Sequence, residues 1–154
     1  MDWHCFNHRL ELAVNDAITS CSEVNYFKHF MDKLYYLYSQ SPKSRRALEQ
    51  CTRDVGGELL KIGRILDVRW AASSFRSVHA VWKSYAALHK HFTRASTDVS
   101  LDVSLDGRDR AQYLGLAKKL GSAVFLKNLA LMHDALEELS ELSEFLQSDS
   151  ITLP

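Results

Sequence analysis

The chain has 154 residues and a mass of 17.6 kDa, enough for one ordinary domain or for a piece of a larger one. Hydrophobic residues make up 46% of it and charged residues 25%, which argues against a disordered or fibrous protein. The uninterrupted apolar runs are too short for a membrane-spanning helix, so we expect no membrane partner. Three cysteines without a visible export signal predict free thiols in a reducing compartment.

The zero net charge hides an asymmetry along the chain. Residues 1–95 hold 14 basic and 9 acidic side chains, a balance of +5, and six of the seven histidines. Residues 96–154 hold 5 basic and 10 acidic side chains, a balance of −5. This pattern predicts either two surfaces with different partners or two halves that attract each other within the fold.

The first half of the chain predicts three helices. Apolar residues recur at three- and four-residue steps over residues 3–20 and again over 24–38. Ser41 followed by Pro42 indicates an N-cap and the first position of a third helix, which we expect to end near Arg53, before Gly56 and Gly57.

Residues 59–66 are the least helical part, and their β-branched side chains and central glycine predict an extended segment or a packed loop. Asp67 then predicts a helix cap before Arg69, with the helix continuing to Phe92 and bending near Ser84. We expect its buried face to contain Phe75, Val78, Val81, Trp82 and Tyr85.

The last part predicts a loop and two helices. Residues 95–109 are rich in Ser, Thr, Asp and Gly and indicate a mobile surface loop, followed by helices over 110–120 and 122–147. In the longer helix an apolar seam, either intramolecular or between subunits, is expected at Phe125, Leu129, Met132, Leu136, Leu139 and Leu146. Ser143 falls on this seam, and four glutamates take the solvent side.

Together these elements predict an all-α fold of about six helices. Its regions are a basic helical region over 1–95, a flexible loop over 96–109, a helical hairpin with a long acidic helix over 110–147, and a tail over 148–154.

Cys5 and His8 stand three residues apart, near one face of the first helix. Zinc prefers these ligands, but a structural site needs four. The other candidates, among them the pair His89 and His91, form no second Cys-x-x-Cys or His-x-x-x-His unit. A cysteine nucleophile with a histidine base is a further alternative. A packed cysteine beside a backbone-bonded histidine is the simplest interpretation, so we expect no metal and no other cofactor.

Other catalytic patterns are missing. Asp16, Asp32, Asp54 and Asp67 lie in separate elements, whereas two-metal nuclease chemistry needs converging carboxylates. Gly56 and Gly57 are followed by Glu58, not by the Gly-Lys-Ser or Gly-Lys-Thr of a phosphate-binding loop.

Arg69 and Trp70 form a pair suited to nucleic acid. An exposed tryptophan can stack on an unpaired base, and an arginine can hold a phosphate. Lys61, Arg64 and Arg76 lie nearby in the sequence and extend a basic track. The alternative is that Trp70 belongs to the hydrophobic core.

Three segments resemble the hAT superfamily of transposases, and the resemblance covers nearly the whole chain. Residues 5–17, CFNHRLELAVNDA, are similar to its Cys-x-x-His-x-Leu-x-Leu-Ala-x-x-Asp-Ala segment, and Arg69-Trp70 in VRWAASSFR is similar to its Arg-Trp pair. Residues 136–147, LEELSELSEFLQ, resemble its Leu-x-x-Leu-Ser-x-x-x-x-x-Leu-Gln helix. The closest similarity is with vertebrate host proteins derived from such transposases.

The resemblance implies a piece of a ribonuclease-H-like core entering its all-helical insertion, either as a fragment of a longer product or as a truncated copy. No position here matches the family's two aspartates and glutamate, so it implies a chain without catalytic activity. It also implies that Cys5 and His8 lie near the DNA-handling side and that Arg69 and Trp70 stabilise unpaired DNA.

These observations lead to a first hypothesis of nuclear DNA binding without catalysis. In it Arg69, Arg64 and Arg76 contact phosphate, Trp70 stacks on a base, and His8 supports the site. A second hypothesis is a protein-interaction scaffold or adaptor that captures a partner, or a second copy, through the 122–147 helix. By resemblance alone, such an adaptor is linked to SUMO transfer.

Overall fold

The computed structural model describes residues 6–65, 70–97 and 107–147, and every regular element in these residues is a helix. The elements are α1 (Phe6–Thr19), α2 (Ser22–Gln40), α3 (Pro42–Val55), α4 (Trp70–Lys83), α5 (Tyr85–Thr97), α6 (Gly107–Leu120) and α7 (Ala123–Gln147). The all-α prediction is confirmed. The described part has seven helices because the helix expected up to Phe92 is interrupted at Ser84.

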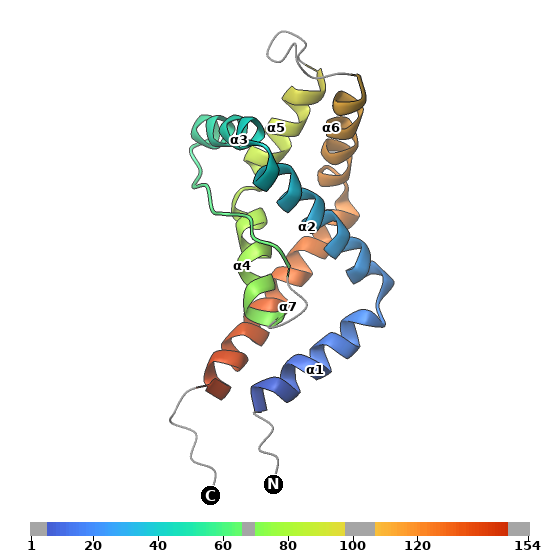
Figure 1. Ribbon diagram of the computed structural model, residues 1–154, viewed down its shortest axis with the longest axis vertical. Helices are drawn as coiled ribbons and strands as arrows, with labels where there is room; N and C mark the ends of the chain where they lie inside the picture. Colours follow the sequence, from blue (N-terminus) through green and yellow to red (C-terminus); the bar gives the residue numbers. More distant parts are fainter. Residues whose placement is uncertain (1–5, 66–69, 98–106, 148–154) are drawn as a thin grey trace, which may run out of the picture.

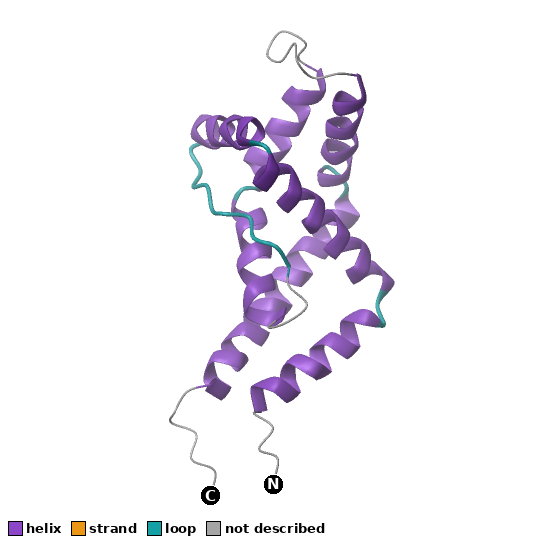
Figure 2. Cartoon of the chain, in the orientation of Figure 1, coloured by secondary structure: helices purple, strands orange, loops and turns teal. Residues whose placement is uncertain are grey.

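The molecule is elongated, and its helices form two groups (Figure 1). At one end α5 packs against α3 and α6, and at the other end α4 packs along α7 while α1 contacts both. Helix α2 crosses between the groups and contacts α1 and α3 (Figure 2). The loop over 58–65 returns the chain from α3 to the start of α4.

Local chemistry fixes both ends of α3. Ser41 is extended, and its hydroxyl oxygen accepts a hydrogen bond from the Ser44 amide at 3.1 Å, with Pro42 in the first turn. At the other end Gly56 adopts φ 70°, and its amide closes the helix onto the carbonyl of Arg53. Both ends lie close to their predicted positions.

One hydrophobic core runs through both groups of helices. It begins with Phe27, Phe30, Met31 and Leu34 of α2 and continues through apolar residues of every later helix. The loop over 58–65 contributes Ile62 and Ile65, which are 8% and 4% exposed, so the predicted packed loop is confirmed. The expectation for Trp82 is wrong, because its side chain is 39% exposed at the edge of the α4–α7 contact.

The predicted seam of α7 packs within the same chain, on α4 and, at Phe125, on Phe27 and Phe30 of α2. Phe125, Leu129 and Leu136 are 5%, 0% and 1% exposed, so the alternative of a seam between subunits is wrong for these residues. Ser143 is 2% exposed on the same face, and its hydroxyl oxygen accepts a hydrogen bond from the side-chain amide of Gln147. The four glutamates of the helix are exposed, as predicted.

Two further expectations differ from the structure. Helix α5 continues to Thr97 and α6 begins at Gly107, so the expected loop over 96–109 is shorter at both ends, and its residues 98–106 lie outside the described ones. The expected hairpin of α6 and α7 is wrong in its packing, because α6 packs mainly on α5 and α7 mainly on α4. The cause is the turn at Gly121 and Ser122, which redirects the chain (Figure 1).

Two leucines of α7 provide a test of this packing. Replacing Leu136 with Ala is expected to lower the free energy of unfolding by about 2–5 kcal/mol, because it opens a cavity against α4. Replacing Leu131, which is 67% exposed, with Ala is expected to change the free energy of unfolding by less than about 0.5 kcal/mol. Urea denaturation measures both values, and equal losses would contradict an internal seam.

Candidate nucleic-acid interface

The structure describes part of the predicted site. His8, Arg64 and Arg76 have exposed side chains. Trp70 is the first residue of α4, and its side chain lies outside the described residues, as do Cys5 and Arg69 entirely. The fold determines where α1, the loop over 58–65 and α4, which carry these residues, contact one another.

Helix α1 is joined to the start of α4 by a hydrogen bond. The backbone amide of Ala71 donates to Oε2 of Glu11 at 3.3 Å, across 60 positions of the sequence. First-turn amides of a helix lack intrahelical acceptors, and a carboxylate there also interacts favourably with the helix dipole. His8 lies one turn before Glu11 on α1, so this hydrogen bond holds the helix that carries His8 against the start of α4.

The loop over 58–65 meets α4 one to two turns further along. A Cβ atom on Gly63 would lie only 2.9 Å from Oγ of Ser77, so the absence of a side chain permits the close approach of loop and helix. Arg64 and Arg76 are the chain neighbours of this contacting pair, and both are exposed. The contact therefore brings two predicted phosphate-binding arginines to the same part of α4.

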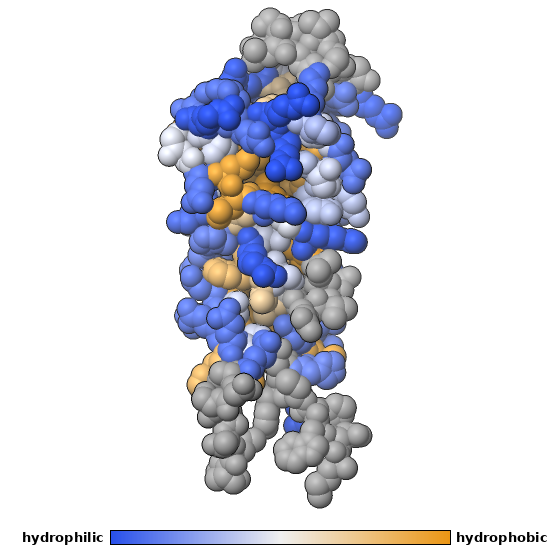
Figure 3. Space-filling view, turned by 60° about the vertical axis from the view of Figure 1, so that its left-hand side comes forward, coloured by the Kyte–Doolittle hydropathy of each residue, from blue (hydrophilic) through white to orange (hydrophobic). Residues whose placement is uncertain are grey.

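Helix α1 and the loop over 58–65 therefore both meet α4: Glu11, one turn after His8, binds the Ala71 amide, and Gly63, next to Arg64, approaches Ser77, next to Arg76. Figure 3 shows the side of the molecule that carries the loop, where hydrophilic residues surround an apolar area in the middle of the face. In chemical terms, the described guanidinium groups can bind phosphate oxygens.

A cluster that the sequence analysis missed joins α4 and α7. Nδ1 of His79 lies 3.0 Å from Nε2 of His133, and the rings of Phe75 and Trp82 pack against His133. Glu137 lies 3.8 Å from the other nitrogen of His133. Among the described residues no group of three or more histidine, cysteine or acidic side chains could hold a metal ion. The two histidines therefore form a hydrogen bond between helices.

A buried polar pair joins α2 and α5. The hydroxyl of Tyr38 lies 2.8 Å from Nδ1 of His91, which is 5% exposed. Burial lowers the pKa of His91 from 6.5 to about 4, because the charged imidazolium loses its hydration, and Arg94 adds repulsion. Burial also raises the pKa of Tyr38 well above its usual value, so both groups are neutral near pH 7.

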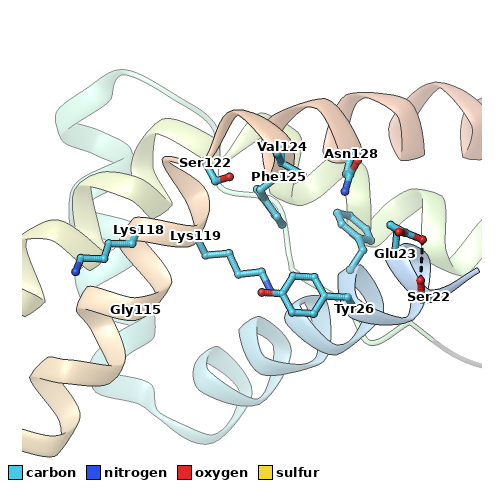
Figure 4. A pocket seen from close by; sticks show the side chains of 11 residues that line it. Ser22, Glu23, Tyr26, Gly115, Lys118, Lys119, Ser122, Val124, Phe125 and Asn128 are labelled. Atoms are coloured by element: carbon cyan, nitrogen blue, oxygen red, sulfur yellow. Dashed lines mark hydrogen bonds between the residues drawn. The ribbon is translucent and has the colours of Figure 1, made fainter.

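A pocket of about 740 Å³ lies between the starts of α2 and α7 and the end of α6 (Figure 4). Phe27 and Phe125 contribute apolar surface, and Nζ of Lys119 sits 3.2 Å from the ring centroid of Tyr26. Lys119 lowers the pKa of the Tyr26 hydroxyl by hydrogen bonding and by its charge. None of the residues predicted for nucleic-acid binding lines this pocket.

No protein-family model matches the chain, and no solved structure matches it significantly. Within the described residues, none of the helices combines the length and apolar character needed to cross a bilayer.

The contact that brings the two arginines together can be tested through Gly63. Replacing Gly63 with Ala is expected to lower the free energy of unfolding by about 1–3 kcal/mol, because the new methyl group collides with Ser77. In a Ser77→Ala background most of this loss should disappear. Urea denaturation of the unchanged protein, the two single variants and the double variant measures the coupling between Gly63 and Ser77. Equal losses from Gly63→Ala in both backgrounds would contradict the contact.

The buried histidine predicts a stability that falls in acid. The unfolded chain binds a proton at His91 near pH 6.5, whereas the folded chain resists it down to about pH 4, so stability is present above 6.5 and is lost as the pH falls. The loss contributed by this residue is about 3 kcal/mol. Urea denaturation of the unchanged protein and of His91→Gln across this pH range measures the effect. The free energy of unfolding should fall less steeply with decreasing pH in the variant, and equal slopes would contradict a buried, neutral His91.

Proposed function

We propose that this chain is a non-catalytic, hAT-transposase-derived domain that binds DNA in the nucleus through the first two turns of α4 and the elements anchored there. The proposal is supported by two contacts with α4, Glu11 to the Ala71 amide and Gly63 to Ser77, because these residues are close in sequence to His8, Trp70, Arg64 and Arg76.

In the proposed complex the exposed side chains of Arg64 and Arg76 bind phosphate oxygens. Arg69, which precedes Trp70 in the sequence, adds a third phosphate contact. Trp70 stacks on an unpaired base. Any of the bases can take part in this stacking, because each has a flat aromatic face. His8 supports the same surface from α1. Binding of this kind follows the backbone and unpaired bases, so we expect weak dependence on sequence and strong dependence on salt.

The charge distribution supports an oriented complex. Helix α7 carries five acidic side chains and only one basic side chain, so its exposed acidic face repels a phosphate backbone. Glu11, the acidic residue beside the proposed surface, is bonded to the Ala71 amide at the positive end of α4. We therefore expect a polyanion to bind at the arginines and not on the exposed acidic face of α7.

Binding to a fluorescent single-stranded or hairpin DNA tests the proposal. Trp70→Ala is expected to weaken binding by about 1–3 kcal/mol, because a stacking surface is lost. Arg76→Ala should weaken binding to all sequences and reduce the slope of log affinity against log salt by about one. Fluorescence anisotropy across a salt titration measures both effects.

The matched control is Arg46→Ala, which removes an equally exposed arginine from α3, outside the proposed surface. Its salt slope should equal that of the unchanged protein. If Trp70→Ala and Arg76→Ala bind DNA as tightly as this control, the proposal is refuted.

A further inference from the structure

Helix α7 has a second apolar face that does not belong to the core. Val124 and Leu131 are each 67% exposed, Leu142 is 42% exposed, and Ala135 is exposed as well. At about 100° per residue these four positions fall within an arc of about 40° on the helix surface. They form a narrow stripe, which we call the outer stripe and define as Val124, Leu131, Ala135 and Leu142.

The charges beside the outer stripe are acidic over most of its length. The side chain of Asp134 is 82% exposed, and Glu138 and Glu141 are exposed next to the stripe. Helix α7 contains five acidic residues, all at or after Asp134, and its single basic residue is Lys127 near the start. An apolar stripe bordered by carboxylates on a helix is complementary to a helix whose apolar stripe is bordered by cations.

We propose that the outer stripe binds an amphipathic helix of a partner protein whose apolar face is flanked by Lys and Arg. Leucine-type side chains of the partner would pack on Leu131 and Leu142, and its cations would face Asp134, Glu138 and Glu141. This interaction uses a different surface from the one proposed for DNA.

A second copy of this chain is a poorer occupant on charge grounds. Two α7 helices side by side in parallel would place acidic halves against each other, and an antiparallel pair would offer each acidic half only one Lys127. The basic side chains of α3 do not help, because Val55 is the single large apolar residue on that helix that is exposed. Helix α3 of a second copy therefore does not offer an apolar stripe with basic flanks.

The stripe also sets the size and direction of the partner segment. From Val124 to Leu142 the helix rises about 27 Å, which matches a partner helix of about 18 residues. The acidic residues lie toward Leu142 and the single lysine toward Val124, so the cations of the partner should concentrate on the end that meets Leu142.

The experiment uses the full chain and a synthetic 18-residue peptide with a leucine stripe flanked by lysines. Binding is followed by fluorescence anisotropy, and we expect Leu131→Gln to weaken it at least tenfold. The same substitution at Leu114, an exposed leucine on α6, is the matched control and should leave affinity unchanged. Glu138→Lys should weaken binding severalfold without removing any apolar surface.

Two control peptides separate the contributions. A scrambled peptide of the same composition retains the charge but lacks the stripe, and a second peptide carries glutamates in place of lysines; both should bind at least tenfold more weakly. Equal binding of the scrambled peptide, or equal affinities of the Leu131→Gln and Leu114→Gln proteins, would overturn the proposal. A concentration-dependent dimer in sedimentation that Leu131→Gln abolishes would overturn it too, because the occupant would then be a second copy.

Discussion

The packing of α4 against α7 is the constraint on which the rest of the structure depends. Leu129 and Leu136 of α7 and Val78 and Val81 of α4 are almost fully buried, so these two helices cannot separate without exposing the centre of the core. Because one face of α7 is used in this way, its remaining apolar positions are left on the surface. The same packing holds α4 in place as a support for α1 and for the loop over 58–65.

Hydrogen bonds between polar side chains give this helical core specific contacts at a few points. Tyr38 meets His91 between α2 and α5, Ser44 meets Tyr113 between α3 and α6, and His79 meets His133 between α4 and α7. A buried polar group without a partner destabilises a fold, so each pair favours one arrangement of its two helices over alternatives. The apolar periodicity of the helices specifies their faces but would permit many such arrangements.

The two proposed surfaces follow the charge asymmetry of the sequence. The surface at the start of α4 collects arginines from the basic part of the chain, and the outer stripe of α7 lies among the carboxylates of the acidic part. Ion pairs also form between Asp54 and both Lys90 and Arg94, and the pKa of Asp54 is lowered. That network lies within the basic part, so it leaves the acidic face of α7 open to a partner.

The sequence by itself determined the helices, because periodicity, the Ser41 cap and Gly56 act over a few neighbouring residues. It also determined that residues 59–65 would not be helical and that the glutamates of α7 would face solvent. Only the tertiary structure decided that the apolar seam of α7 is internal, that Trp82 is exposed, and that α6 leaves α7 to pack on α5. It alone paired His79 with His133 and brought Gly63 to Ser77, because these contacts depend on which helix faces meet, and the packing of the whole core decides that.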